Sequence, residues 1–268
     1  MSATTATGAA IDMEAGEKTS LTNVSTDRPS MVRWIGQPIL CVLAVVASLV
    51  YVNTADVSDT EKRSLAISII LTALRQHMAI SITATLITVV VAVPLGILLT
   101  RGSMRRFARP ITIVAGFGQA APAIGLIALG AVLIELGFWG ATIALVVYGA
   151  LPIVANTVAG IDSVDPRLVE ASRGMGMTGM ATLLRVELPL ALTVIIAGIR
   201  TALVLIVGTA TLASFVGAGG LGDFITTGIK LQQNVTLIVG AILVASLALF
   251  IDWLARLVEL VAAPKGLS

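Results

Sequence analysis

Long stretches without a charged residue are the feature that most constrains the fold of this 268-residue chain. Six windows carry no Asp, Glu, Lys or Arg over 21–26 residues: 34–55, 76–100, 110–134, 136–161, 201–222 and 231–251. A helix needs about 20 apolar residues to cross the hydrocarbon core of a bilayer. The windows predict an all-α integral membrane protein of about six transmembrane helices, near 34–53, 78–100, 111–134, 138–161, 190–213 and 234–254. The 11 uncharged residues between Arg63 and Arg75 are too few to span, and they predict a short helix at the interface.

Composition excludes several functional classes. Apolar residues make up 57% of the chain and charged residues 12%, against about 25% charged in soluble domains. The net charge of +2 is too small to suggest a nucleic-acid partner. A single cysteine, Cys41, and a single histidine, His77, give no disulfide framework and no zinc or His-rich metal site, and we expect both to be packing residues. No metal, cofactor or catalytic residue is therefore expected.

Charge in the loops predicts the orientation. With the N-terminus inside, the inside segments carry 12 Lys and Arg residues and the outside segments carry 4, with Arg200 within a span. The positive-inside rule then places both termini in the cytoplasm. Residues 1–33 show no hydrophobic period and predict a disordered cytoplasmic tail. We expect a transmembrane domain over 34–258 and a cytoplasmic tail over 259–268.

Two nucleotide-binding motifs can be assessed directly. None of the four lysines follows a glycine, so the chain has no P-loop and any ATP hydrolysis belongs to another subunit. Gly217, Gly219 and Gly222 spell G-x-G-x-x-G, but a membrane span precedes them and no acid follows between Asp223 and Asp252. We interpret this stretch as a tight turn at the outer end of the fifth span, with Asp223 capping the next short helix.

Polar residues within spans are candidates for the translocation path. Pro122 should break or kink its helix beside Gln119. Neutral Gln and Asn in spans more often make packing hydrogen bonds than ligand contacts, and for Arg200 we favour snorkelling or pairing across an interface. Glu135 and Asp252 lie near span ends, where solvated or capping roles are expected. The candidates for the path are Gln119, Pro122, Asn156, Thr209 and Thr211.

The inside loop 162–189 contains several residues that are typical of helix starts and helix ends. Asp165 followed by Pro166 is a typical helix start, and Gly174 and Gly176 end that helix after about two turns. Thr178 can cap a second helix through Leu188, and Pro189 opens the fifth span. The sequence therefore predicts two short cytoplasmic helices separated by a glycine turn, and an ordinary helical hairpin would have the same geometry.

The residue types in this loop and their spacing form a recognisable sequence pattern. Glu170-Ala171-Ser172 is followed after three residues by Gly176, after nine more by Val186, and after one by Leu188-Pro189. This pattern resembles the EAA loop of ATP-binding-cassette (ABC) importer permeases, in which Ala and Ile usually occupy the positions of Ser172 and Val186. The resemblance implies a type I importer fold in which Glu170, Ala171, Ser172, Gly174, Gly176, Val186, Leu188 and Pro189 dock on a cytoplasmic ATPase.

Further stretches resemble the osmoprotectant branch of these permeases, which imports glycine betaine, choline, carnitine and similar solutes. They are Gln119–Pro122, Leu151–Thr157, Gly198–Ala202, Gly208–Leu212, Gly217–Asp223 and Asp252-Trp253. The glycine turn is shared with methionine-type permeases, so a permease for an amino acid or for ergothioneine stays open as an alternative.

The resemblance implies an ATP-binding subunit, an extracytoplasmic binding protein and a second permease subunit, in a bacterial plasma membrane. An ion-coupled secondary transporter would usually show two related halves or intramembrane acids, and neither is apparent. A membrane-embedded enzyme would need clustered His, Cys or acidic groups, which one histidine makes a poor alternative.

Overall fold

The computed structural model describes residues 31–54, 57–120 and 122–262. The expected tails at 1–33 and 259–268 lie mostly outside this range, although residues 31–33 begin helix α2 and residues 259–262 end helix α12. The described residues form helices and no strand. In chain order these are α2 (Met31–Thr54), α3 (Asp59–Ser64), α4 (Ile67–Leu99), η1 (Gly102–Met104), α5 (Arg105–Ala120), α6 (Ala123–Leu133), α7 (Phe138–Asp162), α8 (Pro166–Gly174), α9 (Gly179–Thr182), η2 (Leu183–Glu187), α10 (Leu188–Thr209), η3 (Ala210–Val216), α11 (Gly222–Leu231) and α12 (Asn234–Ala262).

The chain divides into two units after Gly36. Of the first unit, the structure describes Met31–Gly36, which form the opening turns of α2. The second unit begins at Gln37 and contains every contact discussed below.

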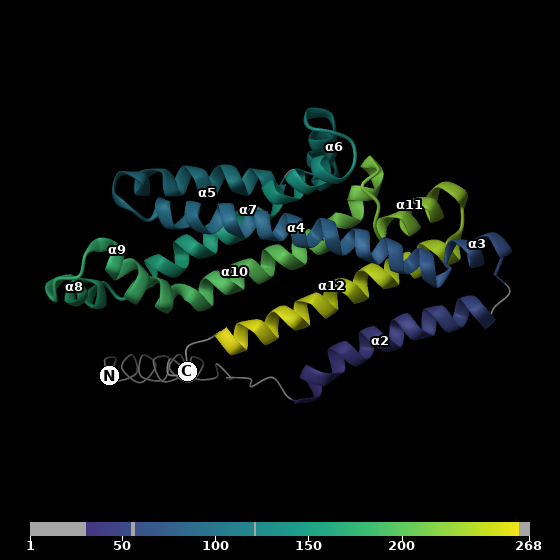
Figure 1. Ribbon diagram of the computed structural model, residues 1–268, viewed down its shortest axis with the longest axis horizontal. Helices are drawn as coiled ribbons and strands as arrows, with labels where there is room; N and C mark the ends of the chain where they lie inside the picture. The colour runs from purple at the N-terminus through teal and green to yellow at the C-terminus, as the bar shows by residue number, and fades with distance from the viewer. Residues whose placement is uncertain (1–30, 55–56, 121, 263–268) are drawn as a thin grey trace, which may run out of the picture. The chain divides into compact units, whose positions relative to one another are not determined.

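Helix α7 packs along both α4 and α10, and these three helices form the centre of the second unit (Figure 1). Ile80 of α4, Leu145 of α7 and Ile206 of α10 are fully buried in one shared cluster. Small residues allow the backbones of α7 and α10 to approach closely. A Cβ on Gly198 of α10 would lie 2.5 Å from Cβ of Asn156 on α7. Small residues at contacts are typical of helices packed within a membrane, where burial of apolar surface gains little.

Five helical stretches in the described ranges are long and apolar enough to cross a membrane: Ile35–Thr54, Ile67–Leu99, Phe138–Asp162, Gly179–Val216 and Asn234–Val261. The third expected span, 111–134, is divided between α5 and the shorter apolar helix α6. The two meet at Pro122, which is the N-cap of α6, as expected from the proline's missing N–H. The all-α membrane architecture predicted from the charge-free windows is confirmed.

The expected short interfacial helix between Arg63 and Arg75 is wrong. Residues from Ile67 onward belong to α4, a single helix of 33 residues that passes through Arg75. At 1.5 Å per residue α4 is about 50 Å long, which exceeds the roughly 30 Å of a hydrocarbon core. Its first turns can therefore carry Arg75 beyond the apolar layer without ending the helix.

The two ends of the helical bundle carry different elements. Figure 1 shows α8 and α9 at one end and α3 and α11 at the opposite end, with α6 at the top of the view between them. Helix α12 runs beside α10 and also packs against α11. The loop 162–189, which contains α8 and α9, therefore lies at one end of the α7 and α10 pair.

Candidate functional site

Helix α8 is built as its sequence predicts. Asp165 is the N-cap, and its carboxylate accepts a hydrogen bond of 2.9 Å from the backbone N–H of Arg167. Pro166 occupies the first helical position, where its missing N–H costs nothing. The helix ends at Gly174, and Gly176 follows with φ of +85°, a left-handed conformation that side chains rarely adopt. These residues fix a two-turn helix with a sharp turn behind it.

Buried hydroxyl groups join α8 to α9. Ser172 of α8 and Thr182 of α9 are 2% and 0% exposed, and their side-chain oxygens lie 3.2 Å apart. Ser172 Oγ also donates to the carbonyl of Val169 at 2.8 Å. Serine in place of the usual alanine therefore supplies a contact between the two helices that alanine could not make.

The second helix of the loop runs without a break into α10, and Pro189 stands in the first turn of α10, as expected. Thr178 caps α9 through a 3.3 Å bond from the N–H of Ala181, as expected. The chain then continues as the π-helical segment η2 directly into α10. Proline cannot donate to the carbonyl four residues earlier and its ring would clash there, and the wider π turn accommodates Pro189 without ending the helix.

The predicted coupling residues fall into an exposed and an internal group. Glu170, Ala171, Gly174, Gly176 and Pro189 are exposed, whereas Ser172 is buried and Val186 and Leu188 are half-buried. Large apolar side chains also stand exposed on this segment: Leu168 (48%), Met175 (78%) and Met180 (65%). We refer to residues 165–187 as the coupling segment, and its exposed face combines these apolar side chains with charged ones of both signs, among them Glu170, Arg167 and Arg173.

One ion pair ties the end of the coupling segment to the residue that follows the C-cap of α4, and a second ion pair joins α5 to the end of α7. Glu187, at the end of the coupling segment, is paired through both carboxylate oxygens with Arg101, and Nη1 lies 3.1 Å from Oε1. In the second pair, Arg105 at the start of α5 lies 3.3 Å from Asp162, the last residue of α7, and both of these side chains are well exposed. The two pairs join residues 86 and 57 positions apart, and sequence reasoning missed both.

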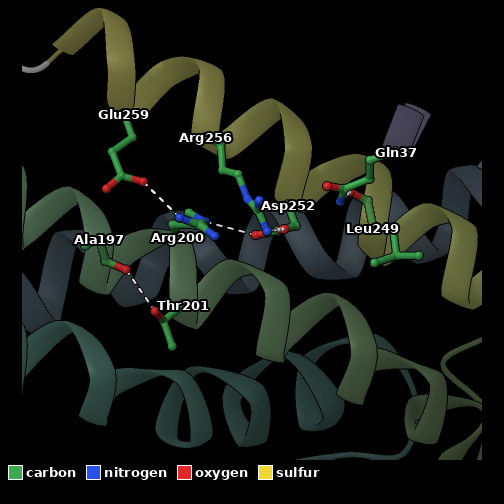
Figure 2. A network of polar contacts seen from close by, with 8 residues as sticks. All are labelled: Gln37, Ala197, Arg200, Thr201, Leu249, Asp252, Arg256 and Glu259. Atoms are coloured by element: carbon green, nitrogen blue, oxygen red, sulfur yellow. Dashed lines mark hydrogen bonds and ion pairs between the residues drawn. The ribbon is translucent and has the colours of Figure 1, made fainter. Parts of the chain in front are cut away.

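Arg200 lies at the centre of a charged network between α10 and α12 (Figure 2). Its Nε lies 2.9 Å from Asp252 and its Nη1 lies 3.0 Å from Glu259. Arg256 binds the other oxygen of Asp252 at 2.6 Å. The expected pairing of Arg200 across an interface is confirmed. The solvated or capping role expected for Asp252 is wrong, because its side chain is 14% exposed and carries two ion pairs.

The candidate path residues do not gather into one cluster. Asn156 lies against Gly198 and donates to the carbonyl of Pro152 at 2.8 Å, so its amide serves helix packing. Thr209 and Thr211 lie at the other end of α10, about 16 Å further along the helix. Pro122 is exposed at the start of α6, whose Ile127 packs with η3. The side chain of Gln119 lies outside the described residues.

The glycine turn packs against α4 at the opposite end from the coupling segment. Gly217, Gly219 and Gly220 all have positive φ, and the N–H of Gly220 donates to Gln76 at 3.1 Å. The tight turn is as expected, but Asp223 does not cap α11, because the N-cap is Leu221 and Asp223 stands in the first turn. Partial burial raises the pKa of the Asp223 carboxyl, and the positive charge of Lys230 opposes that shift.

The buried side chain of His77 makes a hydrogen bond within the helical bundle. His77 is fully buried, and its Nε2 lies 2.9 Å from the carbonyl oxygen of Val207. Across residues 31–54, 57–120 and 122–262, no three His, Cys, Asp or Glu side chains are grouped to hold a metal ion.

Comparison with known proteins assigns the chain to a family. Residues 92–260 match a family model described as "Binding-protein-dependent transport system inner membrane component". The chain belongs to this permease family. The predicted similarity to ABC importer permeases is thereby confirmed over these residues.

The permease has close curated relatives. It is 42% identical over 193 residues to the glycine betaine/carnitine/choline transport system permease protein OpuCB of Bacillus subtilis, covering 72% of this chain and 88% of the relative. It is 39% identical over 197 residues to the osmoprotectant import permease protein OsmW of Salmonella typhimurium, covering 72% and 91%. These relatives confirm the similarity to the osmoprotectant branch.

The fold of the permease also matches solved structures. Inward-facing structures of the MetNI methionine ABC transporter superpose with TM-scores of 0.63 for the native and 0.65 for the selenomethionine crystal form. The first match covers 73% of this chain and 96% of that one at 22% sequence identity. At this identity the likeness concerns the fold alone, which is that of an ABC importer permease.

Proposed function

We propose that this permease forms the membrane path of an ABC importer for osmoprotectants such as glycine betaine, choline or carnitine. The observation that carries the proposal is the coupling segment, with its capped helix α8, its left-handed Gly176 and its exposed face, on which apolar side chains stand beside charged ones of both signs. The substrate class is supported by the names of relatives about 40% identical to this chain.

The coupling segment docks on a separate cytoplasmic ATP-binding subunit. Glu170, Ala171, Gly174 and Gly176 present the contact surface, and Met175 and Met180 add apolar side chains that a groove on the partner can bury. The position of this surface relative to α10 is fixed by Ser172, Val186, Leu188 and Pro189. The permease itself is non-catalytic, and closure of the ATPase moves α8 and, through the continuous helix behind it, α10.

A second permease subunit and an extracytoplasmic binding protein complete the importer. Residues 34–258 form the transmembrane domain, and both termini lie in the cytoplasm. Pro122, Thr209 and Thr211, near the end of the bundle opposite the coupling segment, line the outer part of the path together with Gln119. Asn156, whose amide is occupied within the bundle, acts on the path through helix packing.

Reconstitution tests this function. Proteoliposomes carrying the permease with its ATP-binding subunit should import radiolabelled glycine betaine or choline only when ATP and the binding protein are both present. Import of methionine or ergothioneine in place of these solutes would favour another branch of the family. Import driven by a sodium or proton gradient without ATP would contradict the proposal.

A further inference from the structure

Glu187 is an unusual residue for its position. It is 4% exposed, and it is the one acidic side chain classed as buried in the ranges that the structure describes. Both of its carboxylate oxygens pair with Arg101, the residue that follows the C-cap of α4. A guanidinium and a carboxylate that meet through two parallel contacts are fixed in orientation as well as in distance.

The Arg101–Glu187 pair lies at the junction between the coupling segment and α10, where a deformable turn would weaken the transmission of motion. Glu187 closes the π-helical segment η2, which joins α9 of the coupling segment to α10. π-Helical turns inside α-helices are rare and often mark functional sites. Without a brace, a displacement of α8 and α9 could be absorbed by deformation of this turn. The contact with Arg101 opposes such deformation and connects the turn to α4, which packs along α7.

Stability alone is a weak reason for such a pair. Removing two charges from water opposes the attraction between them, so apolar residues of similar size often serve a fold equally well. The neighbouring pair of Arg105 and Asp162 shows the contrast, since its side chains are 68% and 44% exposed, against 32% for Arg101 and 5% for Glu187. An exposed pair of this kind contributes little in water.

We propose that Arg101 is a positioning residue for energy coupling, fastening the end of the coupling segment to α4 through Glu187. This inference rests on the proposed function. Motion imposed on α8 by an ATPase then reaches the bundle by two routes, along the chain into α10 and through the Arg101–Glu187 pair into α4. Loss of the second route leaves an assembled complex in which ATP hydrolysis and solute import are poorly linked.

The test compares solute imported per ATP hydrolysed in proteoliposomes of the complete complex with its binding protein. Arg101→Ala and Glu187→Gln should both assemble with the ATP-binding subunit, yet import at least about fivefold less solute per ATP, the lower end of typical coupling between sites. Arg101→Lys keeps the charge but not the two-point contact, and its ratio should lie between these. Arg105→Ala is the matched control and should keep the wild-type ratio.

A charge swap separates coupling from folding. Arg101→Glu combined with Glu187→Arg should recover part of the import ratio that either single reversal loses. A wild-type ratio in Arg101→Ala and Glu187→Gln overturns the inference, as does a loss of ATP hydrolysis and import in equal proportion with no recovery in the swap. A wild-type complex without binding-protein-dependent import would instead contradict the proposed function itself.

Discussion

Arg200 shows how one charged residue can be retained in an apolar helix. Its guanidinium contacts Asp252 and Glu259, and Arg256 balances the second oxygen of Asp252, so two positive and two negative groups neutralise one another (Figure 2). Charged groups within membrane spans are costly unless they are paired in this way. The sequence indicates that Arg200 needs a partner. It does not indicate which acid, because the choice depends on how α10 and α12 are rotated against each other.

Replacing Arg200 with Leu leaves two carboxylates without their shared partner. We expect the free energy of unfolding to fall by about 1–3 kcal/mol, less than for a fully buried pair because Arg200 is 28% exposed. Arg105→Leu, which breaks a well-exposed pair, should change it by at most about 0.5 kcal/mol. Thermal unfolding of both variants in detergent measures the difference, and equal stability of the two would contradict this role for Arg200.

The helices themselves show what a single sequence can and cannot specify. Charge-free windows predict five of the six expected spans, but the third, 111–134, is divided between α5 and α6. Asp165, Pro166 and Gly176 predict α8 and its turn because caps act through neighbouring residues. The length of α4 was missed because charges mark where a helix meets water, not where it ends. The continuity of η2 with α10 was missed because a proline usually begins a helix, and only packing around it selects a π turn.

Close packing of α7 against α10 depends on Gly198. A Cβ at this position would lie 2.5 Å from Cβ of Asn156 and 2.9 Å from the carbonyl oxygen of Pro152. Gly198→Val should therefore destabilise the bundle by about 1–3 kcal/mol through overpacking. A Cβ at Gly208 on the same helix would meet no atom within 4 Å, so Gly208→Val should be tolerated. If both variants melt at the same temperature, the close contact at Gly198 is not what holds these helices together.

The whole permease is oriented by its loops. The N-terminal end of α5 and the C-terminal end of α11 lie at opposite ends of the bundle (Figure 1). Arg106 and Lys230, exposed at these two places, provide positions for labelling in a Cys41→Ala background. A membrane-impermeant thiol reagent should label Lys230→Cys in intact cells and Arg106→Cys only after permeabilisation. Labelling of Arg106→Cys from outside would reverse the orientation.

Energy coupling through α8 is the central claim, and ATP-driven import by a Glu170→Arg, Gly176→Val double variant tests it most directly. Valine at φ of +85° is strained by about 1 kcal/mol or more, and the reversed charge changes the exposed face. Insertion should stay normal because each span satisfies its own backbone hydrogen bonds. Import and binding-protein-stimulated ATP hydrolysis should fall at least about tenfold, the effect of 1.4 kcal/mol.

The control Gly179→Ala should behave as wild type. Normal coupled import by the double variant would contradict the account.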